Sequence, residues 1–533
     1  MENSSDSPAH DRNPSPPPEL RQNKELDLAD NVGQSAFSKH WIFSTLMKLI
    51  QEVDSESEKL EADLCELGID VSEDLQNELC ELWDMSMNKD VAEFLHEFKA
   101  MDILGGVIRK SKAPRVVEIC VGILGNMVCC DKVCIAISNN SVLVEVLLAL
   151  MDSRDPQTLV ETFRLCYVCL CNSSVSDIWL KAVKDRLDSQ TNIKFLLQSS
   201  TNGDLLKKTA YFLDKLLELD DDLCCEWATQ EMVQALLEGV HQIGYSQSEE
   251  LEVFLHVFEL ISTTETGVEA LVSEYEKAEV PLKKYLAGVC EYEIVGLEGQ
   301  ERSLCSSLAV LNVIFSASTD IANSIIQDKQ NMRYLLKILE PLSSRIQQIK
   351  VPHSADDNCV KEQKSSSSEN DEPTLAPKET TSETNGNPGS GEPADHDKEG
   401  TEKHSPQEKE DKTTSDNTDT DNKYFLLLFE IIQGLLQDIV CYLHSIMPEQ
   451  VADEGEITVP PVLMYLNKMC SRERVKCLIT ALEEATDPDS EDETDSVVML
   501  SNLAQRYKLR RLSDIIDNVP WKSDTVRKSE SGP

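Results

Sequence analysis

The stretch EICVGILGNMVCC, residues Glu118 to Cys130, decides the fold of this chain. Ile119, Ile123 and Met127 recur at the three-to-four spacing that places side chains on one face of a helix. The residues between them are also mostly apolar, so the pattern predicts a helix that is buried on more than one side. Pro114 precedes this pattern and is expected to open the helix, because proline is well suited to a first helical turn.

Two glycines and one amide interrupt this apolar helix. Gly122 and Gly125 lie inside the pattern, and a glycine within a helix costs about 1 kcal/mol relative to alanine. Their presence indicates that neighbouring helices approach closely at this point. Asn126 follows them in an apolar frame, where its amide needs a hydrogen-bonding partner. A buried helix of this kind is typical of the inner layer of an armadillo repeat.

The same pattern recurs along the chain. Aligning Glu118 with Glu161 gives a shift of 43 residues, and the next two copies follow after 46 and 45 residues. The last copy follows after 53 residues, which indicates an inserted loop or helix. Periods of about 40–47 residues belong to armadillo and HEAT units, so the sequence predicts an all-α solenoid. The copies are Glu161 to Cys171, Thr209 to Leu219, Phe254 to Ser262 and Leu308 to Ser318.

Composition limits the classes of partner. The 533 residues include 50 Lys and Arg against 96 Asp and Glu, a formal net charge of −46. Nucleic-acid binding needs clustered basic side chains, and an acidic body is repelled by anionic membranes, so we expect neither. Two interpretations of the acidic surface remain open: a solvated surface, or a face that recruits basic partners.

Neither export nor membrane insertion is expected. The N-terminus lacks the basic start and apolar core of a signal peptide. The most apolar segment, Phe425 to Met447, carries Glu430 and Asp438, which predicts an amphipathic helix of a solenoid. The 17 cysteines are therefore expected to be thiols.

Composition shifts divide the chain into five segments. Residues 1–34 and 514–533 are polar and are predicted to be disordered tails, and residues 351–422 form a polar segment predicted to be a disordered acidic linker. Residues 35–350 hold the armadillo-like repeats, and residues 423–513 hold helices expected to complete the solenoid. Within the last segment we predict one helix near Pro461 to Ala485 and another over Val497 to Leu512.

Four strings resemble a known family. They are SKHWIF (Ser38 to Phe43), WDMSM (Trp83 to Met87), DVAEFLHEF (Asp90 to Phe98) and CVGILGNM (Cys120 to Met127). Together they resemble the serum amyloid A-like protein family of vertebrates, also called synoviocyte proliferation-associated. The resemblance implies an armadillo-like nuclear protein, present also in the cytoplasm, that promotes proliferation of synovial fibroblasts in the inflammatory response. It implies no enzymatic residue.

The residues themselves predict no enzyme, no cofactor and no metal site. The chain has no Walker loop, HExxH or GxSxG signature. Cys166, Cys169 and Cys171 form a C-x-x-C-x-C run, but a structural zinc site needs a second ligand pair, and the neighbours are core positions.

Two serines match kinase patterns. Ser513 follows Arg510 and Arg511 in an R-R-x-S pattern suited to a basophilic kinase, and Ser490 precedes three acidic residues that suit an acidophilic one. The basic cluster Arg506 to Arg511 is either a nuclear-import signal or the solvated face of a helix.

The function predicted from these observations is a non-enzymatic, monomeric interaction scaffold. Inner helices of stacked units line a concave surface that holds an extended peptide or a helix of a protein partner. Asn126 is the predicted contact, flanked by Glu118, Glu161 and Arg164; the alternative for Asn126 is a satisfied core amide. The alternative function is an acidic regulatory subunit or transport adaptor that binds basic client proteins.

Overall fold

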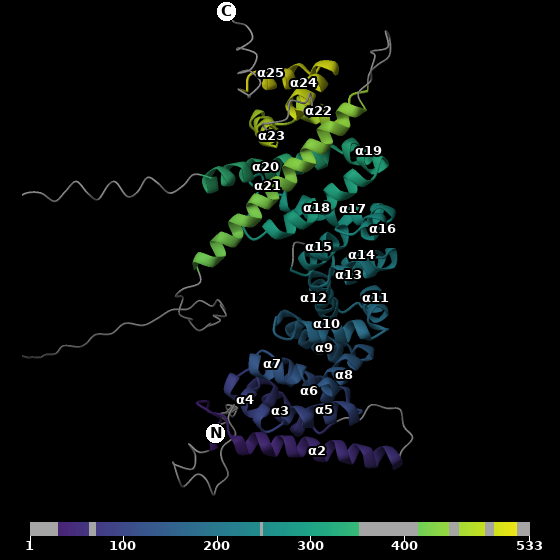
Figure 1. Ribbon diagram of the computed structural model, residues 1–533, viewed down its shortest axis with the longest axis vertical. Coiled ribbons are helices and arrows are strands. Elements are labelled where there is room, and N and C mark those ends of the chain that lie inside the picture. The colour runs from purple at the N-terminus through teal and green to yellow at the C-terminus, as the bar shows by residue number, and fades with distance from the viewer. Residues whose placement is uncertain are drawn as a thin grey trace, which may run out of the picture.

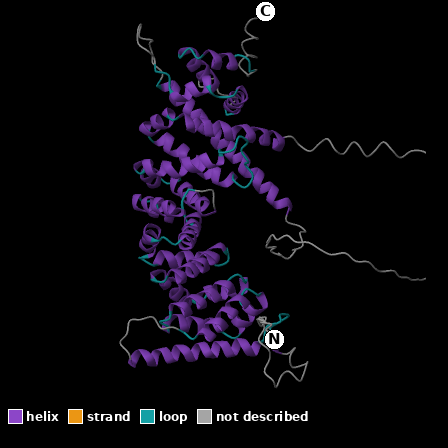
Figure 2. Cartoon of the chain, turned by 180° about the vertical axis from the view of Figure 1, so that it is seen from behind, coloured by secondary structure: helices purple, strands orange, loops and turns teal. Residues whose placement is uncertain are grey.

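The structure is a computed structural model that describes residues 30–62, 71–245, 249–350, 414–446, 458–485 and 495–519. Within these ranges the chain is built from helices, and the β-structure is limited to an isolated bridge between Asn31 and Ser38. Seen from behind, helices joined by loops follow one another along the described chain (Figure 2). The helices are α2 (Lys39–Ala62), α3 (Glu73–Met85), α4 (Lys89–Glu97), α5 (Ala100–Lys110), α6 (Pro114–Met127), α7 (Asp131–Ser138), α8 (Ser141–Ala149), η1 (Leu150–Asp152), α9 (Pro156–Cys171), α10 (Ser176–Asp185), α11 (Ser189–Ser199), α12 (Gly203–Leu219), α13 (Asp221–Trp227), α14 (Gln230–Ile243), α15 (Glu249–Ser262), α16 (Glu265–Ser273), α17 (Tyr275–Val289), α18 (Glu301–Ala317), α19 (Thr319–Gln327), α20 (Lys329–Lys350), α21 (Thr414–Ser445), α22 (Pro461–Lys468), α23 (Arg472–Glu484), α24 (Ser496–Arg506) and α25 (Arg510–Ile516).

The helices stack in units of three along one long axis (Figure 1). The third helices of successive units pack side by side, α6 on α9, α9 on α12, α12 on α15 and α15 on α18. α3 packs on α6 at the N-terminal end of this series, and α21 and α24 extend it past α18. We call these eight helices, α3, α6, α9, α12, α15, α18, α21 and α24, the ladder. The predicted all-α solenoid is confirmed, and the five copies found in the sequence correspond to α6, α9, α12, α15 and α18.

Buried apolar side chains hold the ladder together. A single core cluster extends from Val32 to Val519 and includes side chains from every ladder helix. Phe163 of α9 and Phe212 of α12 are both fully buried and meet edge to face, with ring centroids 5.2 Å apart. Burying one such side chain contributes about 1.5–3 kcal/mol, so the interfaces between units stabilise helices that have little stability alone.

Polar caps mark where many of these helices begin. Asp155 accepts a hydrogen bond from the backbone N–H of Thr158 at the start of α9, and Asn202 accepts one from Leu205 at the start of α12. Such a cap satisfies a backbone donor that has no partner within the helix. Pro114 opens α6, as the sequence predicted.

Neighbouring helices do pack closely at the two glycines of α6, and the glycines make room for side chains of those helices. A Cβ atom on Gly122 would lie 2.2 Å from the Trp83 ring of α3. One on Gly125 would lie 2.7 Å from the guanidinium of Arg164, which belongs to α9. The space saved by each glycine is therefore filled by a large side chain from the adjacent ladder helix.

α21 joins the C-terminal helices to the solenoid. It runs obliquely across the upper part of the stack, in light green, and packs on α18, α20 and α24 (Figure 1). Its segment Asn422–Ser445 is long and apolar enough to cross a membrane by length and composition, and 44% of an 18-residue apolar stretch within it is buried inside the protein. Core helices of soluble proteins can have the same length and apolar composition. Arg474 of α23 also pairs with Glu340 of α20 at 2.7 Å.

The bounds of several C-terminal helices differ from those that the sequence indicated. The segment from Pro461 forms two helices, α22 and α23, and the one from Val497 forms α24 and α25. The second break falls at Lys508, whose φ of 54° lies outside the range of a right-handed helix. α21 begins at Thr414, before the predicted boundary at Lys423. The predicted tails and linker lie largely outside the described residues.

Candidate partner-binding surface

Asn126 lies in the last turn of α6 and ties this helix to α3. One N–H of its side-chain amide donates a hydrogen bond to the main-chain oxygen of Trp83, at 2.9 Å. That oxygen also accepts hydrogen bonds from the hydroxyl of Ser86, at 2.6 Å, and from its backbone N–H, at 3.2 Å. Asn126 is half-buried. Among the described residues, its second N–H and its side-chain oxygen have no hydrogen-bond partner.

A cavity of about 350 Å³ opens beside Asn126. It lies between α4, the end of α6 and the start of α7, and the side chain of Met87 at its edge is 76% exposed. Lys132 pairs with Glu93 across it, with 3.3 Å between Nζ and Oε2. An amide, an exposed thioether and charges of both signs suit a peptide segment, which needs hydrogen bonds to its backbone and apolar contact for its side chains. The lining residues are Met87, Lys89, Ala92, Glu93, Asn126, Cys129, Cys130, Asp131 and Lys132.

Arg164 lies on the other side of α6. It pairs with Glu161, one turn earlier in α9, at 2.6 Å, and donates a hydrogen bond to the main-chain oxygen of Gly122 at 3.2 Å. Its guanidinium also covers Gly125. Arg164 therefore bridges two ladder helices, and Glu161 holds it in place.

Glu118 forms a separate ion pair. Its carboxylate lies 2.5 Å from the guanidinium of Arg115, and Arg115 also reaches the thiol of Cys80 on α3, at 3.3 Å. Partial burial alone would lower the pKa of Arg115, but the hydrogen bond and charge of Glu118 outweigh it, and the pKa is raised. Asn126 bonds to the backbone of Trp83, whose ring packs on Gly122, and Arg164 bonds to the backbone of Gly122. Glu118 and Glu161 instead form ion pairs with Arg115 and Arg164.

A second polar group on the ladder was missed by sequence reasoning. Asp214 of α12 lies 2.5 Å from Nδ1 of His256 on α15, and Arg302 of α18 lies within 3.4 Å of the same ring. The available signal was the spacing, because 42 and 46 residues separate these positions, which is about one repeat.

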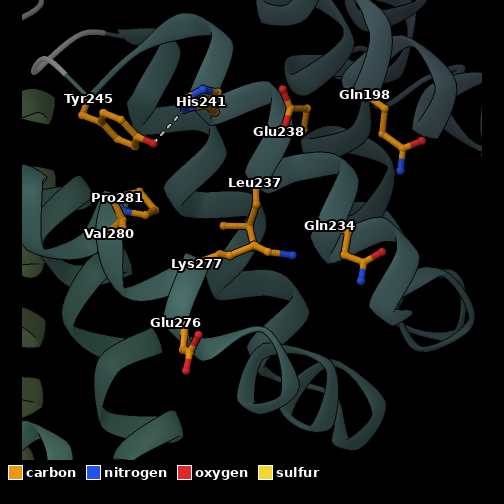
Figure 3. A pocket seen from close by; sticks show the side chains of 10 residues that line it. All are labelled: Gln198, Gln234, Leu237, Glu238, His241, Tyr245, Glu276, Lys277, Val280 and Pro281. Atoms are coloured by element: carbon orange, nitrogen blue, oxygen red, sulfur yellow. Dashed lines mark hydrogen bonds between the residues drawn. The ribbon is translucent and has the colours of Figure 1, made fainter.

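The outer layer holds a larger cavity, of about 520 Å³, between α11, α14 and α17 (Figure 3). Nδ1 of His241 lies 3.2 Å from the hydroxyl of Tyr245 at one edge of it. Gln234 and Lys277, which line it, both donate to Glu274. Together with Gln230, these hydrogen bonds lower the pKa of Glu274 to about 2. Its lining mixes both charges with a few apolar side chains.

The two serines that match kinase patterns have different surroundings. Ser513 is half-buried within α25, and Arg511 of the same pattern donates to the main-chain oxygens of Asn467 and Cys470. Ser490 lies outside the described residues.

The cysteine run lies within α9. Cys166 and Cys169 are buried there, while Cys171 is exposed at the end of the helix. Burial raises the pKa of Cys166. Across the described ranges no group of three or more metal-ligating side chains is arranged to hold an ion.

The third helices of successive three-helix units pack side by side, so this protein is an armadillo-type α-solenoid. Residues 189–486, more than half of the chain, match the family model described as the SAAL1 C-terminal domain. The chain belongs to the SAAL1 family, the serum amyloid A-like group that the sequence resembles.

Relatives in three vertebrates support this assignment. The chain is 44% identical to "Protein saal1" of Danio rerio over 281 residues, which cover 50% of this chain and 59% of that protein. It is 34% identical to "Protein SAAL1" of Homo sapiens over 367 residues, which cover 61% of this chain and 77% of that protein. "Protein saal1" of Xenopus tropicalis is 37% identical over 358 residues, covering 62% of this chain and 77% of that protein.

A solved structure of an engineered protein has 14% sequence identity and a TM-score of 0.42, and the match covers 92% of this chain and all of that one.

Proposed function

We propose that this chain is a non-enzymatic interaction scaffold that holds an extended or helical segment of a protein partner on the ladder, beside Asn126. The observation that carries the proposal is the cavity of about 350 Å³ at the junction of two units. Peptide backbones need donors and acceptors, and Asn126 retains one N–H and its side-chain oxygen next to this cavity. Arg164 and Trp83 hold α6 in position from both sides.

The resemblance to the serum amyloid A-like family supports the cellular part of this proposal. We place the scaffold in the nucleus, with a further pool in the cytoplasm, where it promotes cell proliferation as a monomer. In this role the chain would act by bringing partner proteins together.

A matched pair of methionines tests where the partner binds. Met87 and Met469 are 76% and 65% exposed, and they lie near opposite ends of the solenoid. In affinity capture from nuclei, we expect Met87→Glu to lose the same partners that Asn126→Ala loses. Met469→Glu should retain them. Equal capture by all three full-length variants would contradict the proposed surface.

A second function rests on charge. With 96 acidic against 50 basic residues, the chain suits an acidic regulatory subunit or transport adaptor that carries basic clients. Such binding falls steeply between roughly 50 and 200 mM salt, because exposed charges are screened over this range. A capture that is insensitive to salt but sensitive to Met87→Glu favours the scaffold over the adaptor.

A further inference from the structure

In the loop between α17 and α18, residues 290–300, two large side chains are exposed to solvent. Tyr292 is 74% exposed and Ile294 is 86% exposed. Glu291 and Glu293 flank the tyrosine and are exposed as well. This loop lies within the last and longest repeat interval, of 53 residues, so it accounts for part of the added length.

The loop is anchored on both sides of its exposed tip. Lys337 of α20 is buried, and its ammonium donates to the main-chain oxygens of Cys290, at 2.6 Å, and of Tyr292. On the other side, Val295 and Leu297 are buried in the core. The backbone at Cys290 and Tyr292 is therefore held by Lys337, and the next part of the loop by Val295 and Leu297, while the side chain of Tyr292 projects into solvent.

Tyr292 differs from the other ten tyrosines, all of which lie within the described ranges. It is the one exposed tyrosine of the eleven. The hydroxyl of Tyr275 bonds to Glu279 at 2.6 Å and that of Tyr285 to Gln300 at 2.9 Å, and burial raises the pKa of both phenols. Among the described residues, none forms a hydrogen bond with the hydroxyl of Tyr292 or a ring contact with its side chain.

We propose that Tyr292 is a tyrosine-phosphorylation site. A tyrosine kinase must reach the acceptor hydroxyl and the side chains beside it, which an exposed loop allows and a packed helix does not. Carboxylates on both sides of the tyrosine suit kinases whose substrate groove is basic, because opposite charges attract during the encounter. Glu291 and Glu293 supply these carboxylates.

The transfer balances with ATP as the phosphoryl donor. The phenol oxygen of Tyr292 forms a bond to the γ-phosphorus, the bond between that phosphorus and the β,γ-bridging oxygen breaks, and ADP leaves. The phenolic proton passes to the catalytic carboxylate of the kinase. The product carries about two negative charges at neutral pH.

The new phosphate should stay in solvent. The exposed charged residues next to it in the loop, Glu291 and Glu293, are carboxylates that repel it. Lys337 bonds to main-chain oxygens, which the modification leaves unchanged. Phosphorylation therefore changes the surface and leaves the core packing intact, so the phosphate is available to a separate protein.

The test expresses the full chain in cells whose tyrosine phosphatases are blocked with vanadate, and measures phosphate on every tyrosine by mass spectrometry. We expect phosphate at Tyr292, and its loss in Tyr292→Phe. The matched control is Tyr245→Phe, because Tyr245 is half-buried and its hydroxyl contacts His241. A Tyr292 peptide without phosphate, or phosphate mainly on other tyrosines, overturns the proposal.

A purified assay tests the structural reason. With a purified tyrosine kinase domain and MgATP, native protein should be labelled at Tyr292 at least about tenfold faster than at any other tyrosine, because the others need local unfolding first. Heat-denatured protein should lose this preference. Equal labelling of several tyrosines in the native chain contradicts the argument from exposure.

Discussion

The side-chain amide of Asn126 donates a hydrogen bond to the main-chain oxygen of Trp83, 2.9 Å away, and so joins the ends of two ladder helices. The carbonyl has other donors, since the hydroxyl and backbone N–H of Ser86 both reach it. One N–H of the Asn126 amide is thus bonded, and the side chain is only half-buried. This arrangement lets its two possible roles, in folding and in binding, be separated by experiment.

Asn126→Ala should lower the free energy of unfolding by about 1 kcal/mol or less, because the Trp83 carbonyl keeps its bonds to Ser86 and no buried acceptor is left unpaired. Chemical denaturation of the full chain measures the change. Asn139→Ala, at an exposed position after α7, is the control and should have no effect. A loss of several kcal/mol would show that the amide is mainly structural.

Gly122→Ala should destabilise the solenoid by about 1–3 kcal/mol, because the added methyl group overpacks the contact with Trp83. The ideal Cβ position lies 2.2 Å from that ring, which must move. Gly106→Ala is the control, since nothing lies within 4 Å of its Cβ position in α5, and replacing this glycine should stabilise by up to about 1 kcal/mol.

Combining the change with Trp83→Ala tests the same contact. Once the ring is removed, Gly122→Ala should have little further effect, so the two substitutions should be strongly non-additive. If their effects add, the ring does not press on Gly122.

The repeats could be predicted from the sequence because the apolar spacing within α6 recurs at one-unit intervals. The pairing of Glu161 with Arg164 also follows from sequence, since side chains three apart meet on a helix. The cross-helix partners could not be predicted. The contact of Trp83 with Gly122 depends on the offset between two separate helices, which the repeat length alone does not fix.

The polar group at His256 has the same limit. Spacing of about one repeat places Asp214, His256 and Arg302 at comparable positions of three ladder helices. Whether such positions touch depends on side-chain directions and on how far each unit rotates against the next. α21 could be predicted as a helix from its apolar composition. Its contacts with α18 could not be predicted, because a long segment of sequence separates the two helices.

Glu274 predicts a specific pH dependence. Hydrogen bonds from Lys277, Gln230 and Gln234 lower its pKa to about 2 from an ordinary value of 4.5. Because the pKa is lower in the folded state, the stabilisation is fully present above about pH 4.5 and is lost as the pH falls toward 2. The difference in unfolding free energy between wild type and Glu274→Gln should be constant from pH 7 to 5 and shrink below that.

Denaturant unfolding at pH 7, 5, 4 and 3, at low protein concentration to limit precipitation near the pI of about 4.5, measures this difference. Glu276→Gln is the control, because the Glu276 carboxylate lines the same cavity but does not bond to these three donors. A difference for Glu274→Gln that stays constant down to pH 3 contradicts the role given to the three donors.

Cleaving the chain between α20 and α21 should leave the two pieces bound to each other. α21 packs on α18 and α20, and its Phe425, Leu436 and Ile439 are almost fully buried. A specific protease site placed within residues 351–413 allows the cut, and size-exclusion chromatography then shows whether the fragments elute together.

Leu436→Asp should release the C-terminal fragment, because an unpaired carboxylate would be buried against the other ladder helices. Leu427→Asp, at a position that is 39% exposed in the same helix, should not. Separation of the unmutated fragments would mean that the contacts of α21 are too weak to hold the C-terminal helices to the solenoid without a covalent connection.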